Sequence, residues 1–319
     1  MTMSMNEGDI KYFSFDGNDL IVDKENDDVT YNDEKHVYVG KKGVGEGKKF
    51  ISVTTLIGEF ENKFDSDFWK KYKALEELMG DDFINVKSSL LNTKKWDDSY
   101  IPDSITKEVF EETCNKYVKD WGETNRIACE YGTEIHAEQE TGFYNHAEKM
   151  IKRFNLGGTI PVYKNHHNLD IDTGIIPEML ISYIDPEGML RIAGQSDLII
   201  KNGNHIKVWD WKTNKKLKQK SYFDPKKKKY QMMKYPLNNI MDCNFLHYTL
   251  QLSLYAWMLQ KQNPDLIIDE LRIVHFTHDG EVNEYVLEYL KSDIEKMLKY
   301  YKKQLILRKY EEENKPIIF

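Results

Sequence analysis

Residues 190 to 212 have the sequence LRIAGQSDLIIKNGNHIKVWDWK. Two runs rich in β-branched and aromatic residues flank an Asn-Gly pair at 202–203, and this arrangement is a strong signal for a β-hairpin. With that pair as the loop, the register places Asp197 opposite Val208. Side chains alternate along a strand, so Asp210 shares the face of Val208 and becomes a diagonal neighbour of Asp197, roughly 5 to 8 Å away. The hairpin therefore predicts two carboxylates on one face.

A second hairpin is expected directly upstream, where residues 176–184 lead into a turn at 185–188. Its register pairs Glu178 with Gln195, which brings a third carboxylate to the same face. Lys212 lies two residues beyond the second aspartate, so alternation places its ammonium group there as well. The sequence thus predicts three acids and one amine on neighbouring strands.

Such a cluster suits a divalent cation, because Mg²⁺ and Mn²⁺ prefer oxygen ligands and like charges without a counter-ion repel one another. The alternative is that these acids are solvated outward positions of an antiparallel sheet. That alternative predicts polar residues all along the face. The same face instead carries Ala193, Ile199, Ile206 and Val208, which favours a metal site.

Four short motifs follow one another along the chain. They are Gly132-Thr-Glu-Ile-His136, Gly194-Gln-Ser-Asp197, Asp210-Trp-Lys212 and Gln251-Leu-Ser-Leu-Tyr255. Their order, with acids on expected strands and the His and Gln/Tyr on expected helices, resembles the RecB-type nucleases of the PD-(D/E)XK superfamily. Within these nucleases the chain most resembles the mitochondrial genome maintenance exonuclease and its phage relatives. The resemblance covers about residues 50 to 255.

The resemblance implies an α/β fold, a restriction-endonuclease-like mixed β-sheet core flanked by helices, with an N-terminal helical lobe. It implies a Mg²⁺- or Mn²⁺-dependent deoxyribonuclease that hydrolyses phosphodiester bonds as an exonuclease, from single-stranded ends. Two alternatives stay open: a structure-specific or flap endonuclease with the same site, and a non-catalytic DNA-binding recombination factor. Replication or recombination proteins are candidate partners, and DNA repair and recombination are candidate pathways.

Roles for individual residues follow from the resemblance. The metal ligands it implies are His136, Asp197, Asp210 and the backbone carbonyl of Trp211, and the strand count adds Glu178 as a weaker candidate. Asp197, Asp210 and Lys212 form the expected catalytic set. Gln251 and Tyr255, one helical turn apart on one face, are expected to contact DNA or to buttress the active-site strand.

The charge of the chain is unevenly distributed. The net charge is −8, which argues against a nucleic-acid partner, yet residues 212–234 contain ten lysines and one acid. A basic segment directly after the catalytic strand is where a phosphate backbone would lie. Lys215 and Lys216 are the preferred DNA contacts because they are close to Lys212, whereas Lys226 to Lys229 fit a solvated loop equally well.

The chain is expected to have three parts. Residues 1–27 are acidic and form an ill-ordered tail or a peripheral strand, 28–124 form N-terminal strands and a helical lobe, and 125–319 form the nuclease core. Strands are expected at Val29–Gly40 and Lys49–Ile57. Helices are expected from Pro102 through Trp121 and from Asn125 to Arg153, the latter carrying His136.

Composition excludes several classes. Three scattered cysteines among 319 residues cannot supply a disulfide framework or a four-thiolate site, so no iron-sulphur cluster is expected. No apolar run is long enough for a membrane span, and the acidic N-terminus is unlike a targeting peptide. The chain is expected in the cytoplasm, which is the host cytoplasm if a phage encodes it.

Overall fold

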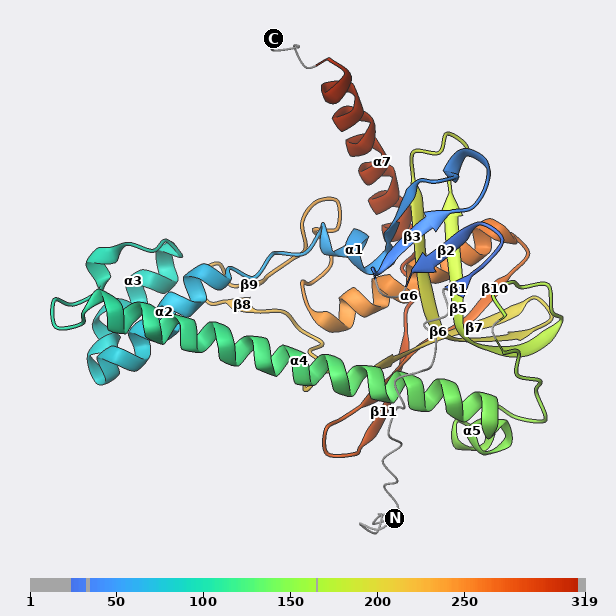
Figure 1. The fold of residues 1–319 in the computed structure, drawn as a ribbon, viewed down its shortest axis with the longest axis horizontal. Coiled ribbons are helices and arrows are strands. Elements are labelled where there is room, and N and C mark those ends of the chain that lie inside the picture. The colour runs from blue at the N-terminus through green and yellow to red at the C-terminus, as the bar shows by residue number, and fades with distance from the viewer. Residues whose placement is uncertain (1–23, 33–34, 165, 315–319) are drawn as a thin grey trace.

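The computed structural model describes residues 24–32, 35–164 and 166–314. Within these ranges one mixed sheet of nine strands forms the centre of the molecule (Figure 1). Its strands are β1 (Lys24–Glu25), β2 (Val29–Asn32), β3 (Val37–Gly40), β4 (Lys49–Ser52), β5 (Thr173–Ile184), β6 (Arg191–Asn202), β7 (His205–Lys212), β10 (Ile267–Phe276) and β11 (Val282–Leu287). A separate ribbon consists of β8 (Phe223–Asp224) and β9 (Lys229–Tyr230).

The pairing of β6 opens a fork in the sheet. One edge of β6 pairs with β5 along its whole length. On the other edge, β4 pairs in parallel with Ile192 and Ala193, whereas β7 pairs in antiparallel fashion from Leu198 onward. Residues 194–197 therefore lie between the two described ladders on that edge. Beyond β7 the order continues with β10, which is parallel to β7, and β11.

Helices cover both faces of the sheet and form a lobe beside it (Figure 1). The helices are α1 (Val53–Gly58), α2 (Ser66–Met79), α3 (Ile84–Thr93), α4 (Lys107–Asn145), α5 (Ala147–Arg153), α6 (Asn244–Gln262) and α7 (Lys291–Glu313), with short 3₁₀ turns η1 (Gly43–Gly45), η2 (Gly80–Phe83) and η3 (Asp98–Tyr100). In the described part of the chain, no helix is both long and apolar enough to cross a bilayer. The mixed sheet with flanking helices confirms the predicted fold class.

Alternation along β7 separates two hydrophobic cores. Ile206 and Val208 pack into a large core with α1, α6 and α7, whereas Trp209 and Trp211 pack into a smaller core with α5 and the end of α4. Both faces of this central strand are covered, which explains its four apolar residues, Ile206, Val208, Trp209 and Trp211. Asp210 is then an exception, because it lies on the face of the larger core and is 1% exposed.

The lobe has a core of its own. It is built on α2, α3 and the first half of α4, and its buried residues include Phe68, Tyr72 and Leu75 of α2. Figure 1 shows α4 running as one long helix from the lobe to the sheet. The turn between β8 and β9 also contacts the lobe, because Lys226 donates a hydrogen bond to Asn92 of α3.

The prediction of separate helices at 102–121 and 125–153 was wrong. Residues 107–145 form a single 39-residue helix, capped by the Thr106 side chain, and the chain breaks only at His146. Gly122 is the weak position between the two predicted helices, and a glycine costs only about 1 kcal/mol relative to alanine there. That cost is too small to end a helix that is continuous on both sides.

The N-terminal strands also differ from expectation. The chain at 29–40 forms two strands instead of one, and β4 ends at Ser52 where a strand to Ile57 was predicted. Ser52 Oγ accepts a hydrogen bond from Thr55 N at 3.0 Å, so this residue caps α1 and stops the strand.

The predicted division at residues 124 and 125 stays a prediction, although β1 to β4 extend the central sheet across it. Residues 1–23 of the predicted acidic tail lie outside the described residues.

Candidate metal centre

Asp197 and Asp210 share one face of the sheet, but the predicted register was wrong by two residues. Ile199 pairs with Val208, so the hairpin loop is shifted toward the C-terminus by one residue, and continuing this register places Asp197 opposite Asp210. A shift by one residue would have moved the side chains to opposite faces, whereas a shift by two preserves the face.

Glu178 joins them through a similar correction. Leu180, not Glu178, is the partner of Gln195, and the flanking pairs place Glu178 level with Asp197. The backbone of Glu178 is in the left-handed region, with φ of 52°. Such a conformation is strained for a residue with a side chain and persists where surrounding structure enforces it. Gln195 still contacts the site, because its Nε2 donates to Glu178 Oε2.

His136 completes a group of three candidate ligands. It comes from the C-terminal half of α4, and its Nδ1 lies 3.5 Å from Asp197 Oδ1 and 3.7 Å from Glu178 Oε1. One ligand atom from each of the three residues lies within 4.8 Å of the others. Two carboxylate oxygens and one imidazole nitrogen are a donor set that Mn²⁺ accepts readily and Mg²⁺ tolerates. The residues therefore fit a divalent cation.

Asp210 and Lys212 form the second half of the cluster. Lys212 Nζ makes an ion pair with Asp210 Oδ2, and Gln251 Nε2 donates to Asp210 Oδ1 at 3.1 Å. Gln251 Nε2 is also 3.4 Å from the hydroxyl of Tyr255. Asp197 is connected to the same strand, because its Oδ2 accepts a hydrogen bond from the backbone N of Trp211 at 2.6 Å. This side-chain bond spans the fork where the β6–β7 ladder has ended.

Burial and mutual repulsion raise the pKa values of the acids. The pKa of Asp210 rises to about 7 because the carboxyl is desolvated and lies near Asp197. Desolvation likewise raises the pKa of Asp197. The pKa of His136 rises to about 9, since the charge of Asp197 outweighs the effect of burial. Burial lowers the pKa of Lys212, but Asp210 and Asp197 more than offset it. Without a cation, this centre holds more negative charge than its buried position favours.

The remaining predicted residues lie in two settings. Gln251 and Tyr255 are buried, at 7% and 3% exposed, and Gln251 contacts both Asp210 and Tyr255. This favours the buttressing role over DNA contact. Lys215 and Lys216 are exposed immediately after β7. The Trp211 side chain points into the opposite core, and its carbonyl as a ligand stays a prediction.

Gly194 and Tyr248 were not predicted as site residues. A Cβ atom on Gly194 would lie 2.7 Å from Tyr255 Cε1, so only glycine lets α6 approach β6 this closely. The ring of Tyr248 lies 4.5 Å from Lys212 Nζ. Its spacing was a usable signal, because Tyr248 precedes Gln251 by one helical turn on the same face.

Comparisons with known proteins identify the family of the chain. A search of curated proteins found no match. Among solved structures, "Crystal structure of SSO0001" matches with 19% identity and a TM-score of 0.32, covering 60% of this chain and 69% of that chain. The family model described as PD-(D/E)XK nuclease superfamily matches residues 73–315. This match includes His136, Glu178, Asp197, Asp210 and Lys212, and the chain belongs to the PD-(D/E)XK nuclease superfamily, a superfamily of metal-dependent nucleases.

Proposed function

We propose that the protein is a Mg²⁺- or Mn²⁺-dependent DNA exonuclease of the RecB type, acting on single-stranded ends. The observation that carries the proposal is the buried cluster at the fork of β6, where His136, Glu178 and Asp197 lie within 4.8 Å of one another and the Asp210–Lys212 pair adjoins them. The RecB assignment and the preference for single-stranded ends rest on the order of the sequence motifs.

Each side chain has a proposed role. His136, Glu178, Asp197 and Asp210, with the carbonyl of Trp211, are the proposed metal ligands. A bound Mg²⁺ or Mn²⁺ supplies a hydroxide near neutral pH and neutralises charge that builds on the phosphate. Lys212 orients the attacking water and stabilises the developing negative charge. Gln251 holds Asp210 through the bond to Oδ1, and Tyr255 supports Gln251.

The exposed lysines beyond β7 are the proposed path for the DNA backbone. Lys215 and Lys216 follow the catalytic strand, and the basic segment continues to the β8–β9 ribbon at the lobe. Neutralising phosphates with lysines releases counter-ions, which explains how a chain of net charge −8 binds DNA.

A nuclease assay with four substrates tests the proposal. End-labelled linear and circular DNA, each single- and double-stranded, are incubated with Mg²⁺, Mn²⁺ or EDTA. Wild-type protein is expected to degrade linear single strands only with metal and to spare circles. Asp210→Asn is expected to lose cleavage. Asp265→Asn, which changes an exposed acid in the turn before β10, is expected to retain it.

Two outcomes would replace the proposal. Cleavage of circular single strands identifies an endonuclease with the same centre. DNA binding by the wild type without metal-dependent product identifies a non-catalytic DNA-binding factor.

A further inference from the structure

The ammonium group of Lys212 lies between two partners of different kinds. On one side it pairs with Asp210 Oδ2, and on the other it lies 4.5 Å from the centre of the Tyr248 ring. The face of an aromatic ring attracts a cation, and the attraction is larger when both are removed from water. The Lys212 side chain is 14% exposed, and Tyr248 is partly buried. Lys212 is thus held in place from both sides.

The orientation of Tyr248 is itself fixed by the segment that follows Lys212. The hydroxyl of Tyr248 donates to Asn214 Oδ1 at 2.6 Å. Donating this hydrogen bond increases the electron density on the phenol oxygen and, through it, on the ring that faces the lysine. The same bond connects α6 to the end of β7.

A third element holds Asn214. Its backbone carbonyl is 2.6 Å from His275 Nε2, and His275 is the direct partner of Lys212 in the parallel β7–β10 ladder. His275 is 4% exposed, so this bond is protected from water. On the opposite side, Thr213 Oγ1 lies so near α4 that it would be 3.3 Å from a Cβ on Gly132. The backbone beyond Lys212 is therefore enclosed by α4, α6 and β10.

We infer that Tyr248 is a positioning residue for Lys212, and that Asn214 and His275 hold Tyr248 and the strand end in register. Tyr248 acts through its ring face, which restricts the ammonium to the side of the centre where Asp210 lies. It is not a catalytic residue, because Lys212, and not Tyr248, pairs with the Asp210 carboxylate. This inference rests on the proposed nuclease function.

The kinetic test separates the ring from the hydroxyl. In Tyr248→Leu the ring face is lost, and kcat is expected to fall about tenfold with KM changed less than twofold. In Tyr248→Phe the ring face remains but its bond to Asn214 is lost, so kcat is expected to lie between the values of the wild type and Tyr248→Leu. Phe245→Leu is the matched control, because it removes another ring of α6, one that packs on Tyr285 of β11. It is expected to leave kcat unchanged.

A second measurement does not depend on activity. In a double-mutant cycle, Tyr248→Leu and Lys212→Met are combined and urea unfolding is measured. The two changes are expected to be non-additive by about tenfold in the unfolding equilibrium constant, because each removes the same contact.

The two tests have distinct failures. Additive unfolding effects, or an unchanged kcat in Tyr248→Leu, overturn the positioning role. A loss in Tyr248→Phe as large as in Tyr248→Leu also overturns it, since the hydroxyl and not the ring face would then be responsible. If the wild type shows no metal-dependent cleavage, the proposed function fails, while the unfolding cycle still decides whether Tyr248 and Lys212 interact.

Discussion

At the scale of single residues, Lys212 has the proposed role of stabilising the charge that develops during cleavage. Its ammonium is buried beside Asp210, and removing one partner of a buried pair usually leaves an uncompensated charge. Here the cost is limited, because the pKa of Asp210 is already raised to about 7 by burial and by Asp197. Without the lysine, the Asp210 carboxyl can take up a proton near neutral pH and remain buried.

Lys212→Ala is accordingly expected to fold and to lose cleavage. Loss of a preorganised group that stabilises developing charge costs about 3 to 4 kcal/mol of activation free energy, or roughly 10² to 10³ in kcat. Circular dichroism checks the fold, and single-turnover cleavage of a linear single strand checks the rate. Full activity of the variant would reject the role of Lys212.

Two glycines are expected to respond in opposite directions to the same change. In Gly194→Ala the new Cβ meets Tyr255 Cε1 at 2.7 Å, inside the packed layer between β6 and α6, so the free energy of unfolding should fall by about 1 to 3 kcal/mol. In Gly122→Ala the new Cβ meets nothing within 4 Å in the middle of α4, and the free energy of unfolding should rise by about 0.5 to 1 kcal/mol. Urea unfolding of both variants checks the pair, and equal effects would show that the close approach at Gly194 is absent.

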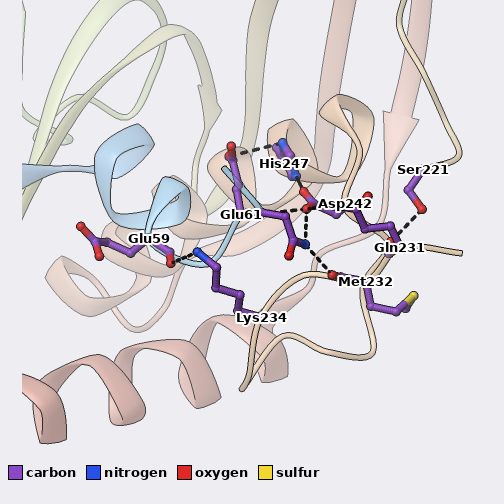
Figure 2. Close-up of polar contacts among 9 residues, drawn as sticks. Glu59, Glu61, Ser221, Gln231, Met232, Lys234, Asp242 and His247 are labelled. Atoms are coloured by element: carbon purple, nitrogen blue, oxygen red, sulfur yellow. Dashed lines mark hydrogen bonds and ion pairs between the residues drawn. The ribbon is translucent and has the colours of Figure 1, made fainter. Parts of the chain in front are cut away.

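At the scale of elements, a polar clamp of Glu61, Asn62, Asp242 and His247 joins the segment after α1 to the start of α6. Figure 2 shows His247 of α6 between Glu61 and Asp242, and Asp242 lies just before α6. His247 Nε2 is 2.7 Å from Asp242 Oδ1, and His247 Nδ1 is 3.3 Å from Glu61 Oε1. Asn62 N donates to Asp242 Oδ2 at 2.9 Å, so the clamp joins the linker after α1 to the start of α6.

Asp242→Asn is expected to weaken this clamp in a pH-dependent way. Burial opposes ionisation of Asp242, but its bonds with His247 and Asn62 hold its pKa below the ordinary 3.8. A carboxyl with a lowered pKa in the folded state stabilises the fold above its unfolded pKa, and this contribution disappears as the pH falls through the folded value. At pH 7 the variant should lose about 1.5 to 3 kcal/mol of unfolding free energy.

Urea unfolding at pH 7 and at pH about 3 measures this difference. The gap between Asp242→Asn and the wild type should narrow at the lower pH. Glu61→Gln is the control, since Glu61 is more exposed and contacts His247 at a longer distance, and its effect should stay below about 1 kcal/mol. A gap that does not change with pH would contradict the role of the ionised Asp242.

At the scale of the whole molecule, a bound cation should stabilise the fold. The centre joins α4 through His136, β5 through Glu178 and β6 through Asp197, so a ligand held by all three favours the folded state over the unfolded chain. Mn²⁺ at one hundred times its dissociation constant should add about 2.7 kcal/mol to the unfolding free energy. A thermal melt with Mn²⁺ and with EDTA measures the shift. Asp197→Asn should show little of it, and an undiminished shift in this variant would place the cation elsewhere.

The charge distribution makes a second prediction at this scale. In an Asp210→Asn background, which isolates binding from cleavage, replacing Lys215 and Lys216 together by alanine should weaken single-stranded DNA binding. Each lost phosphate contact lowers the slope of log K against log salt by about 0.7. Fluorescence anisotropy across a salt series measures it, with Lys309→Ala on the far part of α7 as the control. An unchanged slope would remove these lysines from the DNA path.

Much of this protein was predictable from local sequence. The alternation of side chains has a period of two, so Asp197, Asp210 and Lys212 were assigned to one face even with the wrong register. The sequence predicts helices at 245–260 and 291–308 and strands at 266–277 and 282–287. The structure has these elements at 244–262, 291–313, 267–276 and 282–287, because their apolar periodicity matches the faces that they bury. Motif order and residue type were sufficient for the superfamily, which the family match confirms.

Only the tertiary structure decided how the site is assembled. Asn202, Gly203 and Asn204 permit a tight turn at either of two positions, so the register depended on packing against β4 and β10, which are distant in sequence. The fork at residues 194–197, the left-handed backbone of Glu178 and the contact of Tyr248 with Lys212 arise for the same reason. Alternation along a strand determines which face of the sheet a side chain occupies. Which residue lies opposite it on the next strand depends on how segments distant in sequence pack together in the folded state.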